Sequence, residues 1–358
     1  MRRILVVLLL VAGAGLLARG AFPCDIVSAQ PTCYVALYEG PTENTFELVD
    51  VRGEATTASA GEFLLTTVAV NSDLTVWEWL DGSFSSEVRV VQREVLFPDD
   101  ADVEEVRREN AALMEESQID AVVAALRALG QVNVEPEADG AEITEVLEDS
   151  PAAHAGLEVG EVITAVGGEP TRSADAVIDA LSEFSIDDDV SITLRGTDGA
   201  EHVVAVALED SLTEPGRATL GVIVMTHHHL PTDVSIDERG IAGPSGGLMF
   251  AVTIVDLLSD EDLTGGSVIA GTGIINRQGL VGAIGGVQQK ILGALNRADD
   301  LPPAEVFLVP RGNFEEAKAT PVDREVLLIP VDSLGEALAA LRGLLADQRP
   351  EGALALGP

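Results

Sequence analysis

The chain has 358 residues, of which 46% are hydrophobic, so it is long enough for two or three domains with packed cores. Its 60 acidic and 21 basic residues give a formal net charge of −39. This balance excludes binding to the phosphate backbone of nucleic acids, which requires a basic surface, and it excludes electrostatic attachment to an anionic membrane.

The N-terminus combines basic residues with an apolar run. Arg2 and Arg3 precede residues 4–18, which carry no charge. This pattern targets the chain to a membrane and leaves its bulk outside the cytoplasm. The run is shorter than the ~20 residues that span a bilayer. Two outcomes therefore stay open for residues 1–20: a retained single-pass signal anchor, or a signal peptide whose removal leaves a secreted protein.

Cys24 and Cys33 are the two cysteines of the chain, and both follow the apolar run. A compartment outside the cytoplasm permits a disulfide between them, and two unrelated thiols are the alternative. No histidine or further cysteine lies nearby in the sequence, so we expect no metal site there.

The next segment, 21–127, is expected to be β-rich and to end in a helix. Residues 46–53, 62–70 and 86–97 have strand-like composition. Residues 102–129 have apolar residues at helical spacing, and Gly130 is a suitable stop.

Residues 128–210 alternate short strands with two helices. In "DSPAAHAGL", Ser150 is a helix cap and Pro151 occupies the first helical position. A strand then ends in a Gly-Gly turn, an amphipathic helix spans 174–184, and a hairpin turns at residues 197–199. With "SPAAHAGLEVGEVITAVGGEPT" as its signature, this block resembles a PDZ domain of the circularly permuted bacterial type.

The resemblance implies capture of extended peptides, often C-termini, at a sheet edge. By position in the chain, the loop whose backbone amides hold the peptide carboxylate would be Leu129, Gly130, Gln131 and Val132. The alternative is a PDZ fold that serves as a spacer.

Residues 211–347 are of α/β character, and residues 348–358 are expected to form a loose tail. Strand-like segments lie at 218–226, 232–237, 267–286, 305–310 and 324–331, with helices expected after Gly243, over 287–298 and over 333–345. The whole chain is therefore predicted to be an α+β and α/β multidomain protein.

We find no sequence motif for a nucleotide or another cofactor in this chain. There is no Walker A sequence, so we expect neither ATP nor any other cofactor. The run His227–His228–His229 follows a strand, and three consecutive histidines on regular backbone cannot all face one site. We therefore expect a polar loop there and no metal.

The segment "GPSGG" places Ser245 at the start of an apolar helix, where it is either an N-terminal cap or a nucleophile. Without a suitable histidine, a lysine can remove the serine proton once burial lowers the lysine pKa. The chain has two lysines. Lys318 lies among acids, whereas Lys290 has Val287, Ile291 and Ala294 on its helix face. The backbone at Pro244 and Gly246 is expected to hold the oxyanion.

The two segments "GPSGGLMF" and "GLVGAIGGVQQKILGA" resemble the signature segments of the Lon-type serine protease domain, in which the serine and the lysine form a dyad. Here these residues are Ser245 and Lys290, and "VFLVPRGNFEEA" with Asn313 resembles a later segment of the family. Gly247 departs from the family, which usually has alanine there. The order of anchor, β-rich segment, PDZ domain and Lon-type domain resembles bacterial membrane-anchored proteases that lack an ATPase domain.

These resemblances imply an ATP-independent serine endopeptidase that cleaves protein or peptide substrates outside the cytoplasmic membrane, with the PDZ domain recruiting substrate or gating the site. The resemblance to Lon-type domains also implies that the chain could assemble into a ring of identical copies. The alternative function is a membrane-tethered peptide-binding adaptor whose protease fold is inactive.

Overall fold

The structure is a computed structural model that describes residues 34–85, 87–96, 103–131, 134, 137–211, 215–229, 232–237, 239–298 and 301–358. The chain forms two compact units, and the second, Asn133–Pro231, is inserted into the first. Residues 1–20, Cys24 and Cys33 lie outside the described residues. Within the described part, no helix has the length and apolar character needed to cross a membrane.

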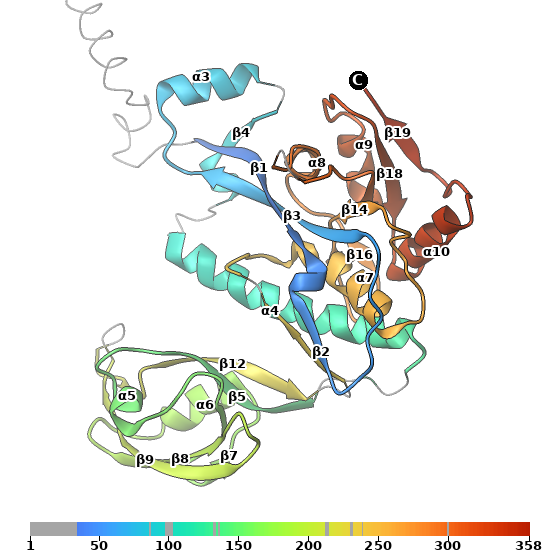
Figure 1. The fold of residues 1–358 in the computed structure, drawn as a ribbon. Coiled ribbons are helices and arrows are strands. Elements are labelled where there is room, and N and C mark those ends of the chain that lie inside the picture. Colours follow the sequence, from blue (N-terminus) through green and yellow to red (C-terminus); the bar gives the residue numbers. More distant parts are fainter. Residues whose placement is uncertain are drawn as a thin grey trace, which may run out of the picture. The chain divides into compact units, whose positions relative to one another are not determined.

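The first unit is built on a seven-stranded mixed sheet (Figure 1). The four central strands, β3, β14, β17 and β18, run parallel to one another. The strands at both ends of the sheet, β4 and β1 on one side and β19 on the other, are paired antiparallel. The order across the sheet is β4 (Arg89–Gln92), β1 (Tyr34–Asn44), β3 (Glu62–Asn71), β14 (Val268–Gly271), β17 (Val306–Pro310), β18 (Val326–Val331) and β19 (Leu354–Leu356).

Helices cover both faces of this sheet. A buried core that includes Leu64, Ala270, Ile291 and Phe307 joins one face to α8 and α9. Helix α7 packs on the other face and in turn contacts α4 and α10. The helices of this unit are α3 (Val76–Phe84), α4 (Val103–Ala128), α7 (Gly247–Leu258), α8 (Val287–Leu295), α9 (Phe314–Ala317) and α10 (Leu334–Leu345).

Short elements complete the first unit. They are the 3-10 turns η1 (Thr45–Glu47), η2 (Arg93–Val95), η4 (Pro244–Gly246) and η5 (Arg311–Asn313), and the strand pairs β2 (Val49–Arg52) with β13 (Asp233–Ile236) and β15 (Ile274–Ile275) with β16 (Val281–Gly282).

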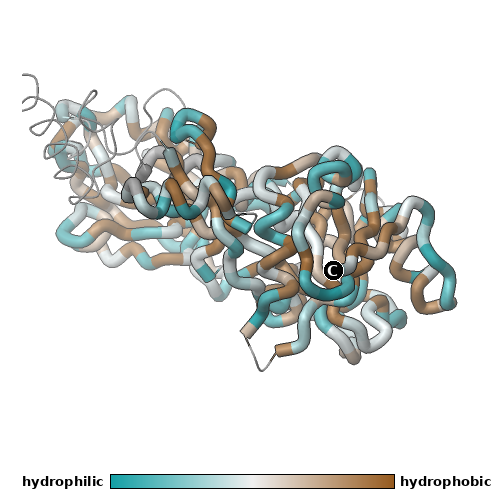
Figure 2. The backbone as a smooth tube through the Cα atoms, turned by 90° about the horizontal axis from the view of Figure 1, so that it is seen from above, coloured by the Kyte–Doolittle hydropathy of each residue, from teal (hydrophilic) through white to brown (hydrophobic). Residues whose placement is uncertain are grey.

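The second unit has a separate core around Ile143, Ile163 and Ile192. Its main sheet has the order β12 (Val222–His229), β5 (Glu137–Val146), β6 (Val162–Val166), β8 (Asp189–Arg195) and β9 (Glu201–Ala207), with β7 (Glu169–Pro170) beside β6. The remaining elements are α5 (Pro151–Ala155), α6 (Ala174–Leu181), β10 (Glu209–Asp210) and β11 (Ala218–Thr219). In Figure 2, hydrophobic stretches of the chain alternate with hydrophilic turns, as expected for units with internal cores.

Several features of the fold differ from the sequence expectations. The N-terminal segment is not a unit of its own, because β1 and β3 share a sheet with β14, and the second unit extends beyond residue 210, because β12 pairs with β5. The tail is not loose, since β19 pairs with β18. The histidine run is part of strand β12, where His227 bonds to Asp139, and the predicted polar loop is wrong.

Candidate active site

Ser245 lies in the 3-10 turn that leads into α7. Gly243 has φ +95°, a conformation that favours glycine, and it turns the chain into this segment. Two groups beyond the end of β14 hold the carbonyl of Ser245: Thr272 Oγ1 at 3.0 Å and the Gly273 N–H at 2.8 Å. This pair fixes the backbone of Ser245 and leaves its side chain free to point elsewhere.

Helix α4 holds the same turn from another direction. The Ser117 hydroxyl donates to the Pro244 carbonyl at 2.9 Å, and the Gly243 N–H donates to the Asn110 carbonyl at 3.2 Å. At Gly247, an added Cβ would lie 2.6 Å from Ser117 Oγ and 2.9 Å from Ile275 Cγ2. The glycine in place of alanine at this position is therefore a consequence of how closely α4 approaches the turn.

Lys290 reaches Ser245 from α8, on the other side of the sheet. Its Nζ lies 2.8 Å from Ser245 Oγ and donates to the Thr66 carbonyl of β3 at 2.7 Å. The lysine is 4% exposed, and this burial lowers its pKa to about 7. Because burial disfavours the ammonium form, a large fraction of this lysine is a neutral amine near neutral pH.

Asn313 fixes the loop before α8. Its side-chain amide exchanges two hydrogen bonds, both of 2.8 Å, with the N–H and the carbonyl of Ile284. Gly286 then starts the helix with φ +69°. The buried asparagine therefore places the first turn of α8 and, through it, Lys290.

A pocket of about 580 Å³ opens beside the two residues. Its walls come from β1, β3, α4 and the segment before Ser245, and they include Leu65, Thr67, Met114 and Ile241. Chain segments that are about 200 residues apart in the sequence thus surround one cavity. The pocket has the size of a site for a small ligand or a few side chains of a peptide.

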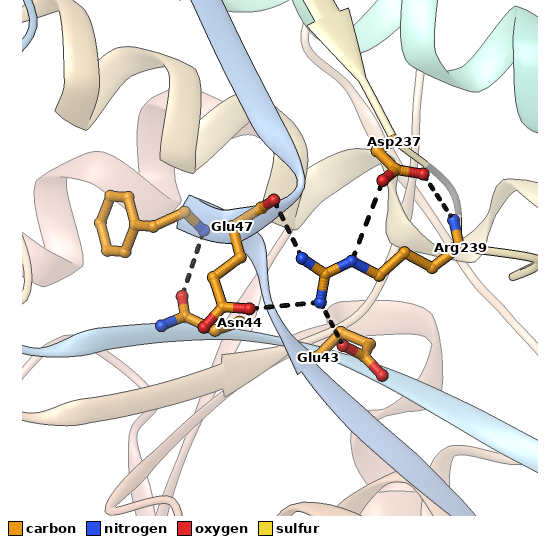
Figure 3. A network of polar contacts seen from close by, with 6 residues as sticks. Glu43, Asn44, Glu47, Asp237 and Arg239 are labelled. Atoms are coloured by element: carbon orange, nitrogen blue, oxygen red, sulfur yellow. Dashed lines mark hydrogen bonds and ion pairs between the residues drawn. The ribbon is translucent and has the colours of Figure 1, made fainter.

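An ion cluster on Arg239 fastens the wall that precedes Ser245 (Figure 3). The guanidinium of Arg239 lies 3.2 Å from the carboxylate of Glu47 and 3.4 Å from that of Glu43, and it donates to the Glu47 carbonyl at 3.3 Å. Asp237 accepts the Arg239 N–H at 3.0 Å. Arg239 has φ +46°, so these contacts hold a non-glycine residue in the left-handed region.

This ion cluster connects the β1–β3 strand pair, which contacts Lys290, with the segment that precedes Ser245. Glu43 lies on β1 opposite Leu65 of β3, which is next to Thr66, the partner of Lys290. Arg239 lies on the segment that leads to Ser245. A single side chain thus bridges the strand pair that positions the lysine and the loop that positions the serine.

The sequence proposal for the oxyanion site is wrong for Pro244 as a donor. Proline has no N–H, so Pro244 cannot donate a hydrogen bond, and its carbonyl instead accepts from Ser117. The N–H groups of Ser245 and Gly246 lie in the first turn, where the helix dipole favours negative charge. Their role with an oxyanion stays a prediction.

The predicted carboxylate loop is not formed by residues 129–131, which directly follow α4 and close its last turn. The N–H groups of Leu129, Gly130 and Gln131 donate to carbonyls of the last turn of α4, at 3.0, 2.9 and 3.0 Å. Gly130 has φ +83°, as in a common helix stop. These amides are thus occupied within the helix end, and Val132 lies outside the described residues.

The second unit offers another groove, which the sequence interpretation missed. A cavity of about 170 Å³ lies between α6 and strand β12, an edge strand of its sheet. Its apolar lining includes Val177, Leu181, Leu220 and Val222. Three residues of the "TLGV" segment, which leads into β12, line this groove: Thr219, Leu220 and Val222.

The described part of the chain contains no group of three or more histidine, cysteine, aspartate or glutamate residues arranged to hold a metal.

Two family models match parts of the chain, one within the second unit and one that begins at the end of the second unit and continues through most of the rest of the chain. Residues 142–195 match the model of the PDZ domain, and residues 219–342 match that of the Lon protease (S16) C-terminal proteolytic domain. Lon protease 2 of Herpetosiphon aurantiacus is 25% identical over 187 residues, which cover 51% of this chain and 21% of that protein. The chain thus spans about a fifth of the length of this relative.

Solved PDZ structures are similar to a quarter of the chain. The PDZ domain of an SdrC-like protein from Listeria monocytogenes is 24% identical, with 24% of this chain and 87% of that one covered and a TM-score of 0.22. GtR34C from Geobacillus thermodenitrificans is 29% identical, with 24% and 98% covered and a TM-score of 0.22.

Proposed function

We propose that this chain, which combines a PDZ domain with a Lon-type proteolytic domain, is an ATP-independent serine endopeptidase with a Ser245–Lys290 dyad. The observation that carries the proposal is the 2.8 Å approach of a buried lysine amine to a serine hydroxyl beside an open pocket. A helix cap does not need this partner, since caps bond to backbone N–H groups.

The chemistry follows from the protonation state of Lys290. The neutral amine accepts the proton of Ser245 as Oγ attacks the substrate carbonyl carbon, and the Thr66 carbonyl then holds the resulting ammonium. The ammonium returns this proton to the leaving amine when the peptide bond breaks. The acyl part of the substrate is then bound to Ser245 as an ester. A water molecule attacks this ester, with Lys290 again as the base, and the bond to Ser245 Oγ breaks so that the serine is released.

The proposal needs no nucleotide. Peptide hydrolysis by this route uses only substrate and water, and the sequence has no Walker A motif. We also propose that residues 1–20 attach the chain to the cytoplasmic membrane with the catalytic unit outside it, as the Arg2–Arg3 and apolar pattern favours. Self-assembly stays a prediction.

The second candidate function is a peptide-binding adaptor, and the groove between α6 and β12 favours it. An edge strand beside an apolar groove suits an extended peptide that adds a strand and inserts apolar side chains. In an active enzyme, the same groove would recruit substrate or gate the dyad.

A serine-reactive phosphonate probe tests the proposal on the full chain. We expect wild-type labelling and cleavage of an unfolded protein, both reduced by about 10³-fold or more in Ser245→Ala and in Lys290→Met. Lys318→Met is the matched control, because this lysine is on the surface and pairs with Glu315, and it should behave as wild type.

Labelling that survives in Ser245→Ala would assign the reaction to another residue. An unlabelled, inactive wild type that still binds peptides tightly would favour the adaptor.

A further inference from the structure

The amphipathic aromatic residues of the chain gather in one corner of the first unit. The sequence has two tyrosines and two tryptophans. Tyr34 and Tyr38 lie on β1, and Trp77 and Trp79 lie on α3, the helix beside β4 and β1 in Figure 1. The rings of Tyr34 and Trp79 are in contact, with centroids 6.0 Å apart. Tyrosine and tryptophan are the residues most enriched where a membrane meets water.

Helix α3 presents two aromatic side chains to solvent, one of these tryptophans and a phenylalanine. Trp77 is 59% exposed and Phe84 is 88% exposed. They are seven residues apart, which is two helical turns, so they share a face of α3. Half-buried Leu80 lies between them on that face. A capping box between Thr75 and Glu78 stabilises the start of the helix.

The position of this corner in the chain indicates what covers it. Tyr34 follows the apolar run 4–18 by only the residues 19–33, which reach at most ~50 Å when fully extended. If residues 1–20 attach the chain to a membrane, Tyr34 and the α3 residue Trp79 that it contacts therefore stay within this distance of the bilayer, so α3 can reach its surface. A second copy is a poor alternative, because two chains of charge −39 repel each other.

We infer that the exposed face of α3 docks on the bilayer, with Trp77 and Phe84 inserted at the level of the phospholipid headgroups. This inference rests on the membrane attachment proposed above. The contact is aromatic and apolar in character, because Glu78 and Asp81 add negative charge to the helix. Zwitterionic phosphatidylcholine is the surface that fits, and anionic lipids should weaken the docking.

The two tryptophans allow a direct test, since both lie on α3. The full chain is reconstituted in phosphatidylcholine vesicles whose acyl chains carry, or lack, bromine near the headgroup. Trp79→Phe leaves Trp77 as the only tryptophan, and Trp77→Phe leaves Trp79. We expect bromine to remove most of the Trp77 emission and to affect half-buried Trp79 much less. Phe84→Ser should reduce the quenching of Trp77, whereas Val203→Ser, at an exposed apolar residue of the other unit, should not.

Flotation of the same vesicles separates the two proposals. Protein that does not float with the vesicles overturns both the membrane attachment and the docking. If the protein floats but bromine does not quench Trp77, the docking alone is overturned. This holds even if the Trp77 emission shifts to shorter wavelength, because such a shift without quenching places Trp77 away from the lipid. Stronger quenching in phosphatidylglycerol vesicles than in phosphatidylcholine would also overturn it, because the contact would then be electrostatic.

Discussion

Lys290 is a lysine buried in a protein core, where its amine is largely removed from water. Burial lowers its pKa from 10.5 to about 7. The destabilisation from this lysine is full below pH of about 7, where both states are protonated. Between pH of about 7 and 10.5 the unfolded chain binds a proton that the folded chain does not, so the destabilisation decreases as the pH rises through this range. A core that retains such a residue carries a cost in stability, which fits a functional role better than a structural one.

The lowered pKa predicts how activity depends on pH. Only neutral Lys290 can accept the serine proton, so kcat/KM should rise through pH of about 7 and level off above it. The measurement is the hydrolysis rate of a short uncharged peptide between mildly acidic and alkaline pH. A profile that is flat over this range would contradict a lysine base.

Arg239 gives a second prediction at this scale. Arg239→Gln removes the ion cluster with Glu43 and Glu47 that fastens the loop before Ser245. These groups are partly exposed, so we expect a modest loss of about 2–5-fold in kcat with little change in KM. Wild-type activity should fall as salt screens the cluster, and the variant should lose this dependence.

Arg324→Gln, which removes an exposed arginine paired with Asp323, is the control. It should change neither kcat nor the salt dependence of the activity. Equal salt dependence in wild type and Arg239→Gln would show that the cluster does not position the loop.

Among the elements, helix α4 has a role that its sequence does not predict: it holds the turn that carries Ser245. The helical spacing of residues 102–129 predicts this helix, but only as the end of a separate N-terminal segment. In the structure it packs on α7, and Ser117 and Asn110 hold the turn that carries Ser245. The sequence gives no local sign of this, because a helix pattern shows which face is buried but not which element covers it.

The fit of α4 against the turn predicts a coupling between Gly247 and Ser117. Gly247→Ala introduces a methyl group against Ser117 Oγ and Ile275, and overpacking of this kind costs about 1–3 kcal/mol. We expect lower activity and a lower urea midpoint. Ser117→Ala in the same chain should recover part of the loss, so the two changes should be non-additive.

Leu113→Ala, at an exposed residue of α4, is the matched control and should recover nothing when combined with Gly247→Ala. Strict additivity of Gly247→Ala and Ser117→Ala would contradict the contact.

Helix α3 shows why some elements were missed. The segment "VWEWL" is rich in β-branched and aromatic residues, which suits a strand as well as a helix. The decisive signal was the Thr75–Glu78 capping box, three residues apart. For β12, the three histidines suggested a loop, but a strand at the edge of a sheet accepts polar side chains.

At the scale of the whole molecule, the second unit is an insertion in the first. All seven strands of the larger sheet come from residues outside Asn133–Pro231. The Lon-type match begins at residue 219 and leaves β1, β3 and α4 outside, although these elements complete the same fold and line the active-site pocket. The unit that holds Ser245 and Lys290 thus consists of chain segments on both sides of the insertion.

This arrangement predicts the result of removing the insertion. A chain in which a flexible Gly-Ser linker replaces Asn133–Pro231 should unfold cooperatively and keep labelling of Ser245 by the serine-reactive probe, because its sheet and dyad are complete. The measurements are a urea titration and probe labelling. A variant without a cooperative transition would show that the first unit needs the second to fold.

The same variant distinguishes the two proposed roles of the PDZ domain. Unchanged turnover of short peptides with reduced turnover of proteins indicates recruitment, whereas changed turnover of short peptides indicates gating.

The sequence by itself determined the features that depend on local pattern: the PDZ and Lon-type signatures, most helices and strands, and Ser245 and Lys290 as the candidate pair. Only the tertiary structure decided that the N-terminal strands belong to the same sheet as β14, and that α4, Thr66 and Arg239 position Ser245 and Lys290. The reason is that the side-chain contacts that position these two residues join positions 127 to 224 residues apart, whereas periodicity and capping signals act over one element at a time.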